Sequence, residues 1–250
     1  IGILSDGKPG HLNQSIGVAS ILSEDLEFSF TIIDLSMRYS SLQALSRIYQ
    51  RFLCRNFNKI NAVKIINLFH PIYVDDFDLL IATGGNTAYI SASLGKKNNI
   101  KVIQIGTVKG IDLKNYSAHI TIEAKDKSPN NIVTTLAPTR YSPIETINRE
   151  KQNKALFLIG GDGSGYKYNL DDWSELVRNI KKLKDESNVS PIIVTSRRTS
   201  KAHEEFLYEQ TLTFSSSASI WFHKDGTNAD LATLFNQVDS IFVTEESSTM

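Results

Sequence analysis

The sequence predicts an α/β protein with two doubly wound domains, each built on a parallel sheet. Short apolar runs alternate with amphipathic helical patterns, which is the order of elements in βαβ units. Several runs end in glycine-containing polar loops, as strands of open parallel sheets do at their carboxyl edge. The alternation stops in a polar, proline-containing segment at 138–153 and then begins again. We therefore expect domains over 1–140 and 154–250, joined by a linker over 141–153.

Composition argues against several functional classes. The 250 residues include 27 Lys and Arg against 27 Asp and Glu, so bulk electrostatic binding of nucleic acid is not expected. The single cysteine, Cys54, allows no internal disulfide, which fits a reducing, cytoplasmic location. No apolar run approaches the roughly 20 residues of a membrane span. We expect no secretory signal peptide, because Asp6, Lys8 and Pro9 interrupt the first apolar run.

The first stretch of the chain contains the richest candidate site. Ile1–Leu4 is predicted as a buried strand, and a helical pattern begins after Pro9 and Gly10. The loop between them lies at the carboxyl edge of its strand, where the free amides of the first helical turn suit an anion. It is not a P-loop, because Pro9 stands where a Ser or Thr would hold magnesium. The candidate site residues here are Asp6, Gly7, Lys8, Gly10, His11, Asn13 and Gln14.

Further strands of the first domain are expected where β-branched, aromatic and other apolar residues alternate or run together. They are Glu27–Leu35, Phe77–Thr83, Lys101–Ile105, His119–Ala124 and Asn131–Thr135. The run Phe77–Thr83 ends in Gly84 and Gly85, which let a ligand approach the backbone closely. Asn86 or Thr87 is suited to cap the helix Ala88–Leu94. Gly84, Gly85 and Asn86 are therefore candidate binding residues.

Between 41 and 69 the pattern is helical, with two apolar stripes. The stripes are Leu42, Leu45, Ile48 and Phe52, and then Ile60, Val63, Ile66 and Phe69. The Lys and Arg residues between the stripes favour the solvated face of ordinary layer helices whose stripes face the core. A basic amphipathic stretch lying on a membrane surface is the alternative.

The second domain repeats the alternation. Strands are expected over Lys154–Ile159, Pro191–Thr195, Ala218–Phe222 and Asp239–Thr244. Helices are expected after residue 168 and over Ala202–Tyr208 and Asn228–Gln237. The sequence stops where a helix would follow the last strand, so we expect this domain to be cut short.

Three loops of the second domain follow strands and combine glycines or hydroxyls with charge. Gly160 and Gly161 open a glycine-rich turn that contains no dinucleotide fingerprint. Ser196, Arg197 and Arg198 suit phosphate groups, since guanidinium makes paired, planar hydrogen bonds to them; a solvent-facing turn is the alternative. The last loop offers hydroxyl and backbone donors to a diphosphate, and its alternative is an acidic helix start. Its candidate residues are Thr244, Glu245, Ser247 and Ser248. The five histidines show no metal-ligand spacing, and we expect no metal site.

Five motifs resemble, in the same order, those of the mitochondrial-fission ELM-type family, which has plant and bacterial members. They are Ser5–Gln14, Thr83–Thr87, Ile159–Gly161, Thr195–Thr199 and Val243–Met250. Two differences stand out: the loop over 161–165 is richer in glycine than the family's, and the family's final helix and last βα units are absent.

This family is distantly similar to GT-B glycosyltransferases, which implies two Rossmann-like domains facing a cleft that holds a nucleotide-sugar. By this likeness the first domain presents Asp6, Lys8 and His11 to an acceptor, with His11 as the general base. The second domain would bind the nucleotide diphosphate without metal or cofactor, through Ser196, Arg197, Glu245, Ser247 and Ser248. The acceptor expected from it is a membrane-associated glycan or lipid, with the protein peripheral to a membrane.

Two other functions remain open at this level. The family resemblance also permits a non-enzymatic adaptor that recruits a dynamin-related protein. A nucleotide-sugar epimerase with the same two-domain design is the third hypothesis. Epimerisation needs no acceptor, and an adaptor would keep its function without His11, so experiments can separate the three.

Overall fold

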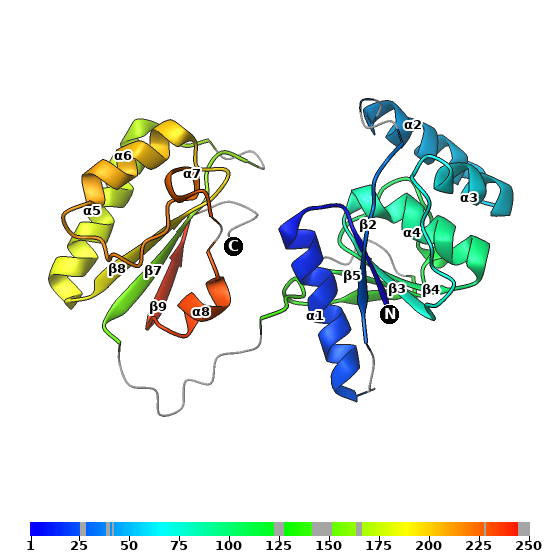
Figure 1. Cartoon of the computed structure of the whole chain (residues 1–250), viewed down its shortest axis with the longest axis horizontal. Coiled ribbons are helices and arrows are strands. Elements are labelled where there is room, and N and C mark those ends of the chain that lie inside the picture. Colours follow the sequence, from blue (N-terminus) through cyan, green and yellow to red (C-terminus); the bar gives the residue numbers. More distant parts are fainter. Residues whose placement is uncertain are drawn as a thin grey trace. The chain divides into compact units, whose positions relative to one another are not determined.

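The computed structural model describes residues 1–25, 29–38, 41, 43–122, 128–141, 152–163, 167–227 and 229–244. The chain forms two compact units, Ile1–Ser142 and Pro143–Met250, shown in Figure 1. Each unit contains a parallel sheet with helices packed against it, so the predicted α/β class with parallel sheets is confirmed.

Unit 1 is built on six parallel strands in the order β2-β1-β3-β4-β5-β6. The strands are β1 (Gly2–Ser5), β2 (Thr31–Asp34), β3 (Leu79–Thr83), β4 (Lys101–Ile105), β5 (Ala118–Thr121) and β6 (Asn131–Val133). The chain passes from β1 to β2 on one side and then returns to β3 on the other side of β1. The point between β1 and β3 is therefore a topological switch point, where open α/β sheets bind their ligands outside the carboxyl ends of the strands.

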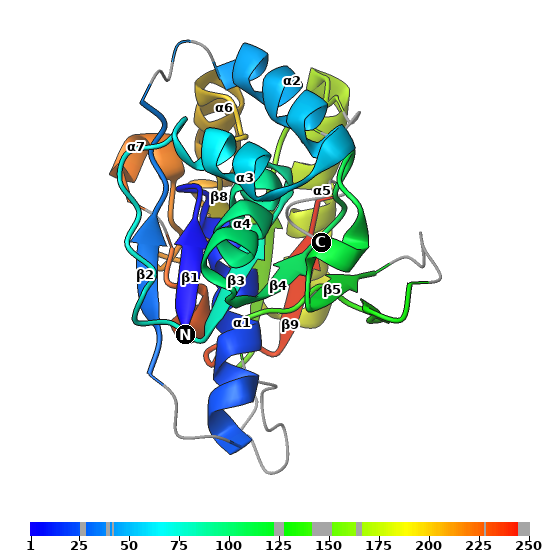
Figure 2. The same ribbon diagram turned by 90° about the vertical axis from the view of Figure 1, so that its right-hand side faces the viewer.

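Helices cover both faces of this sheet, because successive strand residues point to opposite sides. On one face, Ile3 and Ile81 pack against Val18 of α1 (Pro9–Asp25). On the other face, Leu80 belongs to a cluster with Ile90 of α4 (Gly85–Asn98). Figure 2 shows α4 in front of the strands, with α3 (Lys59–Ile66) above it. The described part of this unit also contains the short 3-10 helices η2 (Cys54–Asn56) and η3 (Leu113–Asn115).

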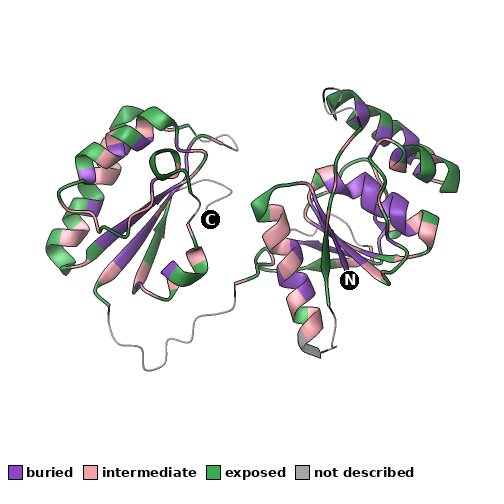
Figure 3. Cartoon of the chain, in the orientation of Figure 1, coloured by how far each residue is buried: buried purple, intermediate pink, exposed green. Residues whose placement is uncertain are grey.

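Helix α2 (Gln43–Leu53) contradicts the expected burial of its apolar stripe. Leu45, Ile48 and Phe52 are 63%, 68% and 63% exposed, whereas Ser46 and Gln50 are buried. In Figure 3 the green, exposed colour dominates this helix. The second predicted stripe divides: Phe69 is buried and Ile66 partly buried, but Ile60 and Val63 are exposed. Leu42 lies outside the described residues.

Unit 2 has three parallel strands in the order β8-β7-β9. They are β7 (Lys154–Ile159), β8 (Ser190–Thr195) and β9 (Ser240–Val243). The helices are α5 (Leu170–Ser187), α6 (Lys201–Thr211), α7 (Phe222–Asp225) and α8 (Leu231–Phe235). Phe157 packs with Trp173 of α5 and Leu207 of α6 on one face, and Leu156 packs with Leu234 of α8 on the other.

The predicted strand Ala218–Phe222 is wrong. Ile220 makes one isolated parallel bridge to Val194, and Phe222 already begins α7. Only a single residue joins the sheet because the chain turns into α7 immediately afterwards. The predicted helix Asn228–Gln237 is shortened to α8, and Asn228 itself lies outside the described residues.

Candidate functional site

The loop after β1 brings together the charged residues of the first candidate site. Gly7 has a φ of 75°, which lets the chain turn sharply after Asp6. Pro9 opens α1, where its fixed φ suits a helix and its missing amide proton costs nothing. Lys8 and His11 therefore follow the turn at the start of α1, on the carboxyl edge of the sheet.

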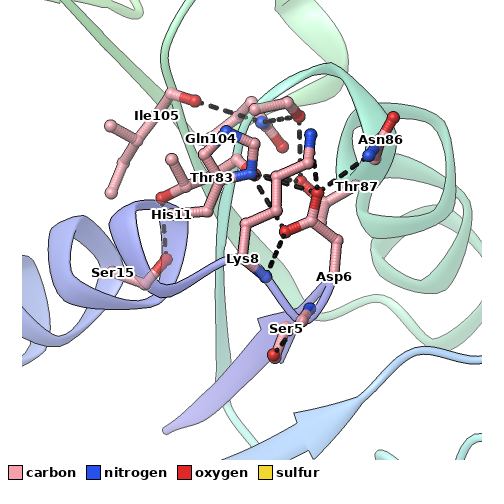
Figure 4. A network of polar contacts seen from close by, with 12 residues as sticks. Ser5, Asp6, Lys8, His11, Ser15, Thr83, Asn86, Thr87, Gln104 and Ile105 are labelled. Atoms are coloured by element: carbon pink, nitrogen blue, oxygen red, sulfur yellow. Dashed lines mark hydrogen bonds and ion pairs between the residues drawn. The ribbon is translucent and has the colours of Figure 1, made fainter. Parts of the chain in front are cut away.

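An aspartate–histidine pair forms at this edge (Figure 4). His11 Nδ1 lies 3.0 Å and 3.1 Å from the two carboxylate oxygens of Asp6. The Asp6 side chain is only 7% exposed, while that of His11 is 28% exposed. Because the carboxylate accepts the proton on Nδ1, the neutral ring keeps an unprotonated Nε2. Among the described residues, Nε2 has no hydrogen-bond partner.

Two further groups stabilise the charged form of Asp6. Asn86 Nδ2 donates to Oδ2 at 2.9 Å, and Lys8 Nζ lies 3.6 Å from the same oxygen. Burial is the largest single influence on the pKa of Asp6 and raises it. The hydrogen bonds from Asn86 and His11, with the charges of His11 and Lys8, together outweigh burial and lower the pKa below its ordinary 3.8.

Gly84, which follows β3, leaves room for the His11 ring because it has no side chain. Its φ is 86°, and a Cβ added there would overlap the imidazole of His11, with Cε1 as the nearest atom. The ring therefore lies directly against the backbone that precedes α4. The Gly84 carbonyl in turn accepts a hydrogen bond from Gln104 Nε2 at 3.1 Å. Gly84, which precedes α4, and Asn86, in its first turn, thus meet Asp6 and His11.

A buried polar network behind the pair was missed by sequence reasoning. Gln104 is fully buried in β4, and its Oε1 accepts from Ser91 of α4 at 3.0 Å. Ser15 of α1 is hydrogen-bonded to Thr83 of β3 at 2.7 Å between their hydroxyl oxygens. The sequence signal for this network was Gln104 itself, a polar residue within the apolar run of β4. This network ties α1, β3, β4 and α4 together beneath Asp6 and His11.

The other predicted residues of this stretch make no hydrogen bond with the Asp6 or His11 side chain in the described structure. Gly7, Gly10 and Gly85 are open to space, since a Cβ on any of them would meet nothing within 4 Å. Asn13 and Gln14 are partly buried in the first turns of α1. They remain predicted binding residues.

In unit 2, the loops that follow β7 and β8 are joined through Thr199. Its buried hydroxyl donates to the Gly160 carbonyl at 2.6 Å and accepts from the Ser196 amide at 3.1 Å. A Cβ on Gly161 would overlap the carbonyl of Arg198, so only glycine lets the loops approach this closely.

The polar side chains of these loops differ in the hydrogen bonds that they make. The Ser196 side chain accepts from the Arg198 amide at 3.2 Å. Thr244, after β9, accepts from the Gly160 amide at 2.7 Å. Arg197 is exposed and makes no hydrogen bond or ion pair with a described residue. Glu245, Ser247 and Ser248 lie outside the described residues.

A second buried carboxylate, Glu204 of α6, was also missed. It is 3% exposed and accepts from the backbone amides of His223 and Lys224, both at 2.9 Å. The Thr195 hydroxyl donates to it at 2.5 Å. Glu204 therefore holds the first turn of α7 against the end of β8. The sequence signal for its burial was the helical spacing of Glu204, Leu207 and Thr211, which places all three on one face of α6.

Comparison with protein families identifies the chain. Residues 9–250 match the mitochondrial fission ELM1 family. The chain belongs to this family. The match covers His11 and every later motif, and it begins just after Asp6 and Lys8. It confirms the family that the five motifs predicted.

Two solved structures resemble this ELM1-family chain weakly. A mutant O-GlcNAc transferase of Thermobaculum terrenum has a TM-score of 0.39 and 8% identity, covering 96% of this chain. The chain spans 47% of that protein, or about half its length. The UDP-GlcNAc 2-epimerase of Neisseria meningitidis, bound to UDP-GlcNAc, also has a TM-score of 0.39, with 11% identity and coverage of 99% of this chain and 78% of that one. No curated protein matches this chain.

Two further observations concern the described part of the ELM1-family chain. It contains no group of three or more His, Cys, Asp or Glu side chains arranged to hold a metal ion. None of its helices combines the length and apolar character that crossing a lipid bilayer requires. A surface hollow beside Asp78, Asn99 and Lys101 lies where β3 and β4 begin, at the edge opposite the Asp6–His11 pair. We place the candidate site at the pair because it lies at the carboxyl edge of the sheet, at the switch point between β1 and β3.

Proposed function

We propose that this protein is a metal-independent glycosyltransferase that uses a nucleotide-sugar donor. The observation that supports this most is the Asp6–His11 pair at the switch point of the unit 1 sheet. A buried carboxylate that orients a histidine, with the second ring nitrogen left open, is a general-base arrangement. Unit 1 would bind the acceptor and unit 2 the nucleotide diphosphate.

The proposed reaction transfers a sugar from a diphosphate to a hydroxyl. His11 Nε2 removes the proton of the acceptor hydroxyl as its oxygen bonds to the anomeric carbon. The bond between that carbon and the diphosphate oxygen breaks, and the electron pair leaves with the nucleoside diphosphate. Asp6 stabilises the imidazolium that forms, and Lys8 supplies a positive charge at the same edge.

Guanidinium groups and backbone donors of unit 2 would stabilise the departing diphosphate. Arg197 supports this role because it is exposed and makes no hydrogen bond or ion pair with a described residue. It lies on a loop that the hydrogen bonds of Thr199 hold in place. The same joined loops contain Ser196, Arg198, Gly160 and Gly161. The Thr244 hydroxyl accepts a hydrogen bond from the Gly160 amide. We assign Glu245, Ser247 and Ser248 to the same site on their sequence alone. These cationic and neutral donors would neutralise the leaving charge without a metal or cofactor.

Donor binding is the first test. The protein is heated with millimolar UDP-, GDP-, CMP- or ADP-sugars, and at least one should raise the melting temperature, because a ligand of the native state stabilises it. Arg197→Ala should reduce that shift. If none of the four classes changes the melting temperature, the proposal is wrong.

Turnover with the stabilising donor is the second test. His11→Ala should lower release of the nucleoside diphosphate by roughly 100- to 10,000-fold. His70→Ala is the matched control, since His70 is an exposed histidine of the same unit. Product that contains an epimerised sugar without acceptor would instead indicate the epimerase. A stable protein partner, with normal function of His11→Ala, would indicate the adaptor.

A further inference from the structure

Helix α2 turns its apolar side outward. Leu45, Ile48, Tyr49 and Phe52 recur at helical spacing, and they are between 43% and 68% exposed. The buried side holds Ser46, Gln50 and Leu53, which are 9%, 3% and 5% exposed. Gln50 donates to the Ser46 hydroxyl at 3.2 Å, but its own Oε1 is buried and has no hydrogen-bond partner among the residues that the structure describes.

This orientation is the reverse of what burial in a water-soluble core favours. Each large apolar side chain left in water forgoes the free energy that its burial would provide. A helix with four such side chains on one stripe is suited to binding another surface.

Helix α3, which contacts α2, also exposes apolar side chains. Ile60 and Val63 are 68% and 38% exposed, and α2 and α3 pack against each other. We call these two side chains, together with the α2 stripe and the basic residues that flank them, the docking face. The basic residues are Arg47, Arg51, Arg55, Lys59 and Lys64, all of them exposed.

Charge identifies the occupant of this face. From Leu35 to Val74 the sequence has six Lys or Arg and no Asp or Glu, although the whole chain has a net charge of zero. Protein interfaces favour arginine but deplete lysine, and opposite charges face each other across them. Apolar side chains whose charged neighbours along the chain are all Lys and Arg match an anionic lipid surface, where the acyl boundary takes the apolar groups and the headgroups take the cations.

We propose that the docking face binds the surface of an anionic lipid bilayer. Figures 1 and 2 both show α2 on the side of unit 1 toward which β1 and β2 run. That is the carboxyl edge that carries Asp6 and His11, so a protein bound through α2 presents this edge toward the lipid surface. The inference does not depend on transferase activity, because vesicle binding has a readout of its own.

Sedimentation with vesicles tests this. The full chain should sediment with vesicles of equal parts phosphatidylcholine and phosphatidylglycerol, should stay in solution with phosphatidylcholine alone, and should release as salt rises. The double variant Ile48→Ser and Phe52→Ser should bind at least about tenfold more weakly. Arg47→Glu with Arg55→Glu should weaken binding by about tenfold as well.

Matched controls come from unit 2. Leu212 is 57% exposed and Lys181 is also exposed, so Leu212→Ser and Lys181→Glu change the same chemistry elsewhere and should bind like the unaltered protein. Circular dichroism of every variant checks that it is folded. The inference is overturned if the unaltered protein binds neither vesicle, or if the serine pair leaves binding unchanged.

A spectroscopic variant distinguishes lipid from protein as the occupant. Phe52→Trp should shift its emission to shorter wavelength on addition of the anionic vesicles, because an interfacial indole leaves water. The alternative outcome is that vesicles do not change the emission, but a rise in protein concentration shifts it to shorter wavelength. If the protein then forms a dimer, and Ile48→Ser with Phe52→Ser abolishes that dimer, a second copy covers the face and the lipid proposal is wrong.

Discussion

The two buried carboxylates, Asp6 in unit 1 and Glu204 in unit 2, have similar burial and opposite surroundings. Asp6 is held by side chains that change charge or reach solvent, His11, Lys8 and Asn86. Glu204 is held by two backbone amides and the Thr195 hydroxyl. Among the described residues the first arrangement leaves His11 Nε2 without a hydrogen-bond partner, whereas the second joins the start of α7 to the end of β8.

This contrast shows that burial of an acid does not identify a functional site by itself. An acid whose partners titrate is a candidate for proton transfer, whereas an acid whose partners are backbone groups is a candidate for a structural role. Changes at the two positions should therefore have different consequences, and the predictions below run from the largest expected effect on stability to the smallest.

Glu204→Ala should destabilise unit 2 by about 3 kcal/mol, because two amides lose their acceptor in a buried place. Both tryptophans, Trp173 and Trp221, lie in unit 2, so denaturant unfolding followed by tryptophan fluorescence reports this unit. Glu205→Ala is the control, since Glu205 is exposed on the same helix. Equal stability of the two variants would mean that Glu204 does not hold α7.

Gly84→Ala should destabilise unit 1 by about 2 kcal/mol, since a φ of 86° suits only glycine and the new methyl group overlaps His11. The displaced ring should also lower any activity that depends on it. Hydrogen exchange of α4, measured by mass spectrometry, gives the local change. Gly85→Ala should be tolerated, because nothing lies within 4 Å of its added Cβ.

Asp6→Asn should cost about 1 kcal/mol near neutral pH, because the charged hydrogen bond to His11 and the ion pair with Lys8 are lost. The fold lowers the pKa of Asp6, so its carboxylate stabilises unit 1 above the ordinary value of 3.8. This stabilisation disappears as the pH falls through the lowered pKa. Unfolding curves of the two proteins, recorded by circular dichroism over this acid range, should therefore converge.

The pH series has its own control in Asp34→Asn, since Asp34 is an exposed carboxylate that ends the neighbouring strand β2. Its difference from the unaltered protein should be smaller. If Asp6→Asn and the unaltered protein keep a constant difference down to the most acid point, the carboxylate is not what stabilises the loop.

Arg197→Ala should change the free energy of unfolding by less than about 0.5 kcal/mol, because an exposed side chain without partners contributes little. Thr199→Val, two residues on, should cost more, since its hydroxyl joins Gly160 and Ser196. Tryptophan fluorescence again follows both. Comparable losses in the two variants would show that Arg197 has a structural role, and would weaken its assignment to a phosphate.

Much of the fold was predictable because it is encoded locally. Lys101–Ile105 and Lys154–Ile159 match β4 and β7 residue for residue, since each is an apolar run bounded by a clear stop. The predicted strand over 218–222 failed because a tertiary contact, the capping of α7 by Glu204, ends the sheet at one bridge. The burial of α2 failed for a related reason, since periodicity marks a stripe without saying which way it faces.

By itself, the sequence determined the order of strands and helices, the glycine turns after them, and the presence of Asp6, Lys8 and His11 in one loop. Those features depend on residues a few positions apart. Only the tertiary structure decided that Asn86, 80 residues away, donates to Asp6, and that Gly84 lies against the His11 ring. These contacts follow from β3 pairing beside β1, and strand order is set by long-range packing that no local pattern records.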